Sequence, residues 1–423
     1  MPREPIKQED AEQIIESLRK GMPPIHGVNY FSVGNEKLLK GIKKFHLKGL
    51  GNKGIIRFIS GSWGSGKTHF FSLVRELAFE EGCLISNVQL TADSAALNKF
   101  EQVFAEIVRK IATPTSYSQN QDSSVYSYRY LLSESLNYLA NGKSISKSVV
   151  THEEYVMAKD KLMADQSIDI DFRKMIAAYW STFLPDSVGG NQDQRRAEIL
   201  QWFIGEGKIS QYKGFQIAKI INKENSKLML QSLGNFVKLS GYKGLVILFD
   251  EAEQSYSVMS KSALKNAQNN LLALINNIEQ LPGLFLIYAT TPDFYNDPKH
   301  GIQQYGALAA RLGQPEQQPP RALKKVWNLD ANEVNLSDYQ VAASKILDIY
   351  TAAYPDDSDE LPSESKVKEF VSRLHSEHSE FSGVNFWRVM VASLIAYFDD
   401  CMEGEERDVE EVYISVMATI KDE

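Results

Sequence analysis

The chain of 423 residues is poor in cysteine and lacks long apolar runs. Its two cysteines, Cys83 and Cys401, are too few for a disulfide framework or a four-ligand zinc site, and no cysteine–histidine cluster with metal spacing accompanies them. No stretch reaches the roughly 18 uncharged apolar residues of a membrane span, and the charged N-terminal residues lack the apolar segment of a signal peptide. We therefore expect a soluble, cytoplasmic protein.

An excess of positive charge is also missing, because the formal net charge is −8. This balance argues against a uniformly basic DNA-binding protein, although a local basic channel is compatible with it. Hydrophobic residues make up 43% of the chain and charged residues 24%, which is ordinary for a globular protein. At roughly 100 to 200 residues per domain, the length predicts two or three packed units.

Strand-like and helical patterns alternate in two parts of the chain. Short apolar runs typical of strands span residues 54–60, 83–90, 245–249, 284–289 and 325–329. Helical spacing is found in residues 8–20, 36–47, 68–79, 94–111 and 262–279. Between about 112 and 235 helical patterns replace the alternation, and residues 331–423 are helical as well. We therefore expect an N-terminal helical lead-in (1–50), an α/β core (51–330) with a helical insertion (about 112–235), and a C-terminal helical domain (331–423).

A glycine-rich loop follows the first strand-like run. Its sequence, Gly61-Ser62-Trp63-Gly64-Ser65-Gly66-Lys67-Thr68, has the pattern G-x-x-x-x-G-K-T and precedes a helical segment. Such a loop points backbone N–H groups at a phosphate beside a helix N-terminus, which favours negative charge. The alternative is a chance turn, but the strand-loop-helix context favours a P-loop. The residues assigned to the nucleotide are Gly61, Gly64, Ser65, Gly66, Lys67, Thr68 and His69, with Lys67 at the β- and γ-phosphates and Thr68 on Mg²⁺.

Two acids end the apolar run at residues 245–249. In P-loop ATPases the first acid at this strand end binds magnesium through water and the next polarises the attacking water. Asp250 is therefore assigned to the metal and Glu251 to catalysis. The alternative is a strand that ends in solvated acids. Joined to the glycine-rich loop, the pair favours hydrolysis over binding alone, and Glu251 distinguishes the chain from small GTPases and nucleotide kinases.

Three further polar residues are candidates by position. Thr290, at the end of the fourth strand-like run, matches the polar residue that senses the γ-phosphate in AAA+ ATPases, with a helix N-cap or a Thr–Pro turn as the alternative. Arg311 precedes the last strand, where AAA+ proteins carry the arginine finger that enters a neighbour's site; the alternative is a surface arginine. Arg388, near the start of a C-terminal helix, is placed to contact the nucleotide or to pair with an acid.

The pieces together predict an α/β fold of the P-loop ASCE/AAA+ type. It has a three-layer parallel sheet, a helical insertion and a C-terminal helical lid domain. Residues Phe31 to Glu36 are candidates to lie against the adenine, although an aromatic residue before a helix is more often a hydrophobic staple. An ABC-type ATPase is set aside because Leu239-Ser240-Gly241-Tyr242 lies too close to the acidic strand and lacks the rest of the LSGGQ signature.

The chain resembles the P-loop ATP-binding proteins of bacterial BREX anti-phage systems, in particular the shorter D-type proteins related to the ATPase part of the C-type. The resemblance spans nearly the whole length and rests on six segments: VNYFSVGNEKLL, FISGSWGSGKTHF, EILQWFIGEGKIS, SLGNFVKLSGYKGLVILFDEAEQ, ALAARL and GVNFWRV. It implies ATP and Mg²⁺ as cofactors, ATP hydrolysis, homo-oligomerisation, and a role in host defence beside other system members such as a helicase or methyltransferase.

Two functions remain open at this stage. The first is an AAA+ ATPase that remodels a defence complex, and the second is a nucleotide-gated scaffold with little turnover. Double-stranded DNA is a candidate partner on two cues, each with an alternative. The first cue is a set of lysines on one helix, Lys37, Lys40, Lys43, Lys44 and Lys48, which either contact DNA or form a solvated helix face. The second is a set of tyrosines around Arg129, Tyr117, Tyr126, Tyr128 and Tyr130, which either stack on bases or belong to a loop or the core. A third small basic patch lies at Arg321, Lys324 and Lys325.

Overall fold

The computed structural model describes residues 6–91, 96–118, 127–147, 149–185, 191–250, 259–332, 334–379, 385–405 and 407–422. In these residues the fold is mixed α/β, built on a six-stranded sheet of order β3-β2-β4-β5-β1-β6. All neighbouring strands are parallel except β2 and β3. The strands are β1 (Ile55–Ser60), β2 (Leu84–Gln89), β3 (Ile111–Ala112), β4 (Leu245–Asp250), β5 (Leu284–Thr290) and β6 (Val326–Asn328).

The central strands are apolar along their length because both faces of the sheet are covered. Every residue of β4 is buried. Successive side chains of a strand point to opposite faces, and accordingly Leu245 and Ile247 belong to one hydrophobic cluster while Val246 and Leu248 belong to another. The structure thus has helices on both sides of a mostly parallel sheet, which is compatible with a P-loop ATPase fold.

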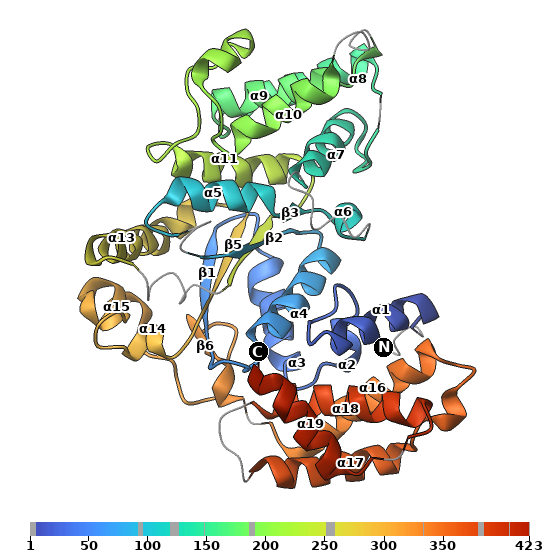
Figure 1. The fold of residues 1–423 in the computed structure, drawn as a ribbon. Coiled ribbons are helices and arrows are strands. Elements are labelled where there is room, and N and C mark those ends of the chain that lie inside the picture. Colours follow the sequence, from blue (N-terminus) through green and yellow to red (C-terminus); the bar gives the residue numbers. More distant parts are fainter. Residues whose placement is uncertain are drawn as a thin grey trace.

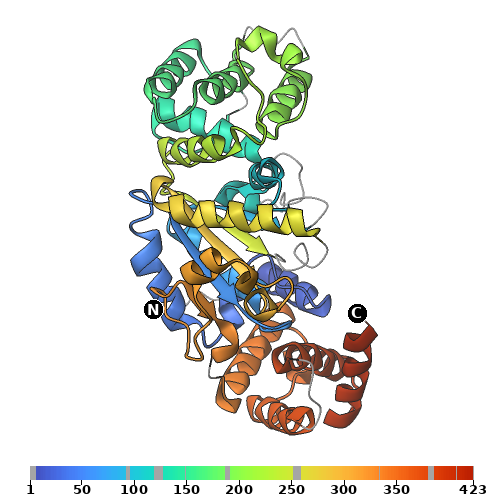
Figure 2. The same ribbon diagram turned by 90° about the vertical axis from the view of Figure 1, so that its left-hand side faces the viewer.

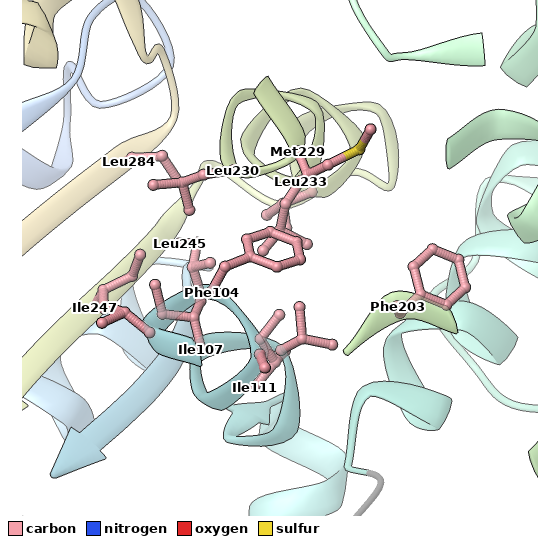
Figure 3. Packing of buried hydrophobic residues seen from close by; sticks show 14 of the residues in the cluster. Phe104, Ile107, Ile111, Phe203, Met229, Leu230, Leu233, Leu245, Ile247 and Leu284 are labelled. Atoms are coloured by element: carbon pink, nitrogen blue, oxygen red, sulfur yellow. The ribbon is translucent and has the colours of Figure 1, made fainter. Parts of the chain in front are cut away.

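Different helices cover the two faces. One face packs against α5 (Phe100–Arg109), α11 (Ser226–Leu239) and α13 (Lys261–Asn277), and Figure 3 shows Phe104 and Ile107 of α5 between the sheet and Leu233 of α11. The other face packs against α3 (Glu36–Ile42), the π-helix η1 (Lys43–Leu47) and α4 (Lys67–Glu80). The glycine-rich loop joins the end of β1 to the start of α4, so it lies at the edge of this second face.

A group of helices lies between β3 and β4 in the sequence and extends away from the sheet (Figure 1). Its packing is aromatic: Phe172 contacts Trp202 and Phe203 edge to face, and the indole N–H of Trp180 donates to the carbonyl of Leu132 at 2.7 Å. The helices are α6 (Pro114–Ser118), α7 (Tyr128–Asn141), α8 (His152–Ala164), α9 (Ile170–Ser181), α10 (Gln192–Phe203) and η3 (Ile209–Phe215), followed by α11.

The C-terminal helices form a bundle at the opposite end of the molecule (Figure 2). Helix α1 (Gln8–Arg19) packs into this bundle, since Ile14, Ile15 and Leu18 share its hydrophobic cluster. An ion pair of 2.6 Å between Arg19 Nη2 and Asp399 Oδ1 joins them at the surface. The bundle helices are α16 (Leu336–Ala353), α17 (Glu364–Ser379), α18 (Phe386–Met402) and α19 (Val409–Asp422), with the turn η7 (Ser358–Glu360).

Shorter elements complete the described chain. They are α2 (Val28–Phe31), η4 (Ile278–Gln280), α14 (Asp293–Asn296), η5 (Ile302–Gln304), α15 (Gly306–Leu312) and η6 (Leu329–Ala331). Within the described residues, no helix has both the length and the apolar character needed to cross a membrane.

One local expectation is wrong in detail. Of the helix expected over 94–111, the structure shows α5 from Phe100 to Arg109, and Ile111 and Ala112 pair with β2 instead of continuing it. The helix expected over 36–47 is confirmed, with α-helical geometry to Ile42 and π-helical geometry from Lys43 to Leu47. Of the tyrosines proposed to stack on bases, Tyr117 and Tyr128 are buried in the protein, which confirms the core alternative for those two.

The buried His46 is expected to make stability depend on pH. Its Nε2 donates to the carbonyl of Ala322 at 2.7 Å, and burial lowers its pKa to about 4. Between pH 7 and 5 the unfolded chain takes up a proton that the folded chain does not, so the free energy of unfolding falls, by about 2 kcal/mol at pH 5 for this residue. Urea unfolding at both pH values should show a smaller decrease for His46→Gln, which retains a donor for Ala322; an unchanged decrease would contradict the assignment.

Candidate functional site

The glycine-rich loop connects β1 to α4 through backbone geometry that glycine permits. Gly64 and Gly66 have φ of +78° and +86°, in the left-handed region. Gly61 has room for no side chain, because a Cβ there would lie 2.2 Å from Ser65 Oγ. Gly66 ends the turn directly before Lys67, the first residue of α4. The loop therefore sits at a helix N-terminus, where anions are favoured.

Neighbouring strands fix the loop in place. The N–H of Gly61 donates to the carbonyl of Thr290 at 3.1 Å. The N–H and hydroxyl of Ser62 donate to the two carboxylate oxygens of Asp330 at 2.8 and 2.9 Å. Sequence reasoning missed Asp330, although its place just after the last strand-like run was a usable signal. Its carboxylate positions the start of the loop from η6, the short helix that directly follows strand β6.

The side chains of the loop fit a bound phosphate. Lys67 is buried, and its Nζ donates to the carbonyls of Gly61 and Ser62 at 2.8 and 3.1 Å and lies 5.7 Å from the Trp63 ring centre. The hydroxyl oxygen of Ser65 is buried and has no hydrogen-bond partner in the described part of the chain. A buried polar atom of this kind calls for a partner. A phosphate oxygen in the loop would supply one.

The two predicted metal ligands lie together. Asp250 ends β4 and is buried, and the hydroxyl of Thr68 donates to its Oδ2 at 3.3 Å. Mg²⁺ in nucleotide sites is held by few protein oxygens, several waters and the substrate phosphates, and a hydroxyl beside a carboxylate fits that donor set. Glu251, the predicted catalytic acid, lies outside the described residues.

The loop opens into a cavity of about 1120 Å³. Its walls include Phe31, Ser32 and Arg388, as well as residues of the C-terminal bundle such as Trp387. The bundle approaches the loop closely, because a Cβ on Gly64 would lie 2.9 Å from that of Asn385, the N-cap of α18. Ligand sites usually occupy about 300 to 1,000 Å³, so the cavity is large enough for a nucleotide between the loop and the bundle.

His69 lies in the wall of this cavity and is half-buried. Its Nε2 is 3.2 Å from the hydroxyl of Ser32, and its ring packs against Phe31. Burial lowers its pKa to about 4, so the imidazole is neutral at pH 7. His69 therefore contributes hydrogen-bonding groups and ring surface here, but no positive charge.

Thr290 and Arg311 are placed differently from the other candidates. Neither Thr290 nor Arg311 is among the described residues that line the cavity. The Thr290 hydroxyl is fully buried and donates to the carbonyl of Ile59 at 2.6 Å. Arg311 is exposed in the last turn of α15, and its carbonyl accepts a bond of 2.8 Å from Lys325 Nζ. The roles assigned to these two residues stay predictions.

The chain was compared with known protein families, curated proteins and solved structures. A family model described as "BREX system ATP-binding protein BrxC/D" matches residues 6–416. Comparisons with curated proteins and with solved structures give no match. The family match includes β1, the glycine-rich loop, Asp250 and most of the C-terminal bundle. Because it extends over nearly the whole chain, this protein belongs to the family of BREX system ATP-binding proteins BrxC/D.

Proposed function

We propose that this protein is an AAA+-type ATPase that binds ATP with Mg²⁺ and hydrolyses it to assemble or remodel a BREX anti-phage defence complex. The observation that carries the proposal is the hydrogen bond of 3.3 Å between Thr68 and Asp250, beside a glycine-rich loop with a buried Ser65 hydroxyl that has no partner among the residues the structure describes. The loop by itself requires only that a phosphate is bound, not that it is transferred. An acid at the metal position suits a site in which phosphoryl transfer takes place.

Each candidate has a distinct role in this proposal. Backbone N–H groups of the loop, with Ser65 and Lys67, hold the phosphates, and Thr68 and Asp250 hold the metal. Glu251 polarises the attacking water, and Thr290 senses the γ-phosphate. His69 and Arg388 contact the nucleotide from the cavity walls. The strand order supports the AAA+ assignment, since β5 lies between the loop strand β1 and the acidic strand β4.

Homo-oligomerisation is part of the proposal. Arg311 is exposed and lies outside its own cavity, which suits a finger that enters the site of a neighbouring copy. We also propose that residues 331–423 act as a lid, because Asn385 contacts the loop and Arg388 lines the cavity. A helicase or methyltransferase of the defence system, and double-stranded DNA, are the further proposed partners of this cytoplasmic ATPase.

ATP hydrolysis at increasing protein concentration tests the proposal. Turnover per subunit should rise with concentration for the wild type. Glu251→Gln should bind ATP but hydrolyse it at least about 100-fold more slowly, and Arg311→Ala should lose about 10³-fold in rate. Arg373→Ala, which removes an exposed arginine of the C-terminal bundle, is the matched control and should behave as the wild type.

The opposite result would identify a different function. If hydrolysis is absent or independent of concentration, and Arg311→Ala has no effect, the finger assignment is wrong. Tight ATP binding under those conditions would support the nucleotide-gated scaffold instead. Repeating the hydrolysis assay with duplex DNA shows whether DNA is needed to stimulate turnover.

A further inference from the structure

Two basic segments that are far apart in the sequence meet on one face of the protein. The first is α3 with η1, and the second is the segment 321–325 before β6. They touch at Ala322: a Cβ on Gly41 would lie 2.6 Å from the Ala322 Cβ. His46 Nε2 and Arg57 Nε donate to the Ala322 carbonyl at 2.7 and 3.3 Å. These contacts hold the second segment against the first.

The combined surface, called here the basic surface, is rich in exposed cations. Lys37, Lys40 and Lys44 lie in α3 and η1 at spacings of three and four residues, which favours one side of the helical segment, and Lys48 directly follows η1. At the α-helical rise of about 1.5 Å per residue the four lysines span roughly 16 Å, which gives a row of positive charge. The exposed cations of the basic surface are Lys37, Lys40 and Lys44 of the first segment, Lys48 and Lys53 between η1 and β1, and Arg321, Lys324 and Lys325 of the second segment.

Few carboxylates neutralise this surface. Lys324 pairs with Glu316 at 2.7 Å, and Lys43, at the border, pairs with Glu81 at 2.6 Å. The other lysines of the basic surface and Arg321 make no ion pair with any residue in the described part of the chain. The whole chain carries a net charge of −8, so these positive charges are segregated from an acidic remainder. Segregation of this kind is the electrostatic footprint of a polyanion site.

Two large apolar side chains stand among the cations. Phe45 is 46% exposed, with Lys44 Nζ 5.0 Å from its ring centre, and Leu323 is 64% exposed. An acidic protein segment needs only the charges. DNA also offers base steps, between which architectural proteins insert Phe or Leu from within a cationic surface. The combination therefore favours DNA over an acidic peptide.

We infer that the basic surface binds the phosphate backbone of double-stranded DNA, with Phe45 and Leu323 directed at a groove. The inference deepens the DNA contact named in the proposed function and rests on it. Duplex DNA carries one negative charge per about 1.7 Å of axis, so the lysine row faces several phosphates at once. Because backbone contacts do not read sequence, the binding is expected to be independent of sequence.

The basic surface also reaches the helix that carries the predicted finger. Lys325 Nζ donates to the carbonyl of Arg311, the residue near the end of α15. DNA held by Lys325 would therefore lie next to the proposed contact between copies. A second copy of the chain is the competing occupant of this face, and the experiment separates the two.

The test is fluorescence anisotropy of a labelled 30-base-pair duplex at increasing salt, with full-length protein. For the wild type, the logarithm of the association constant should fall linearly with the logarithm of the salt concentration. Replacing Lys40, Lys44 and Lys48 with alanine should reduce the slope by about 0.9 per lysine and weaken binding at low salt by at least about tenfold. Replacing Phe45 and Leu323 with serine should weaken binding with little change in slope. Lys143, Lys265 and Lys366, exposed lysines elsewhere, are replaced together as the matched control and should change nothing.

Four results would overturn the inference. The first three are a flat salt response of the wild type, an equal loss in the control triple variant, and displacement of the duplex by polyglutamate at equal charge concentration, which indicates an acidic protein partner. A triple variant that binds DNA normally but loses self-association assigns the surface to a second copy, which also contradicts DNA binding there. ATP binding is measured on every variant and should be unchanged, so failure of the DNA site is distinguishable from failure of the nucleotide site.

Discussion

Replacing Lys67 with alanine is expected to weaken ATP binding by at least about 100-fold. Its ammonium group is buried at the end of the glycine-rich loop, where it donates to the carbonyls of Gly61 and Ser62. Bound phosphates would take over those bonds. A hydrogen bond to a charged group contributes about 1.5 to 3 kcal/mol, and two of them correspond to a factor of 100 or more in affinity, since each 1.4 kcal/mol is about tenfold.

Isothermal titration with ATP and Mg²⁺ measures this effect. Lys67→Met keeps most of the side-chain volume and should lose the same affinity, which separates the charge from the packing. Lys366→Ala removes an exposed lysine of α17 and should bind ATP as the wild type does. Thermal unfolding of each variant verifies the fold. Retention of affinity within tenfold in Lys67→Ala would show that the phosphates bind elsewhere.

Replacing Asp250 with alanine is expected to lower the rate of ATP hydrolysis by at least about 100-fold, the size of effect that follows loss of one preorganised electrostatic group. The carboxylate is buried beside the Thr68 hydroxyl. In the proposed site these two groups would supply the oxygen donors on the protein side of the metal. Without the acid, Mg²⁺ would be held by phosphates, water and a single hydroxyl. Nucleotide binding in the absence of Mg²⁺ should change little, because the proposal assigns the acid to the metal and not to the phosphates.

A magnesium titration of the hydrolysis rate distinguishes this role from a structural one. Asp250→Asn keeps the shape and one oxygen, so part of the activity should return at high Mg²⁺ concentration. Asp356→Ala, at an exposed site between α16 and α17, is the control. If Asp250→Ala retains wild-type rates with an unchanged dependence on Mg²⁺, the metal assignment is wrong.

Local patterns were sufficient to locate the sheet and the loop. The apolar runs at 245–249 and 284–289 correspond to β4 and β5 with ends shifted by one residue, because a strand buried on both faces must be apolar throughout. The glycine pattern located the turn between β1 and α4 for a similarly local reason. Phosphate binding at a helix N-terminus needs that order of residues within a single segment.

Contacts between distant segments could not be predicted in this way. The bond from Ser62 to Asp330 and the contact between Gly64 and Asn385 join residues that no periodicity relates. The same limit explains the end of α5, where pairing of Ile111 with β2 prevails over helix propensity. It also explains why the lysines of α3 and the cations before β6 gave two separate signals, although Ala322 brings them onto one surface.

The packing of α1 among the C-terminal helices has a consequence for synthesis on the ribosome. The apolar side of α1, with Ile14 and Leu18, emerges before its partners on α16 and α18. Until α16 and α18 have been synthesised, this side lacks the contacts that bury it in the folded protein. Residues 18–23 and the C-terminal helices both line the cavity, so the cavity beside the glycine-rich loop is enclosed only after the C-terminal helices have been synthesised. Nascent chains stalled before α16 should therefore carry a folded sheet with an open site.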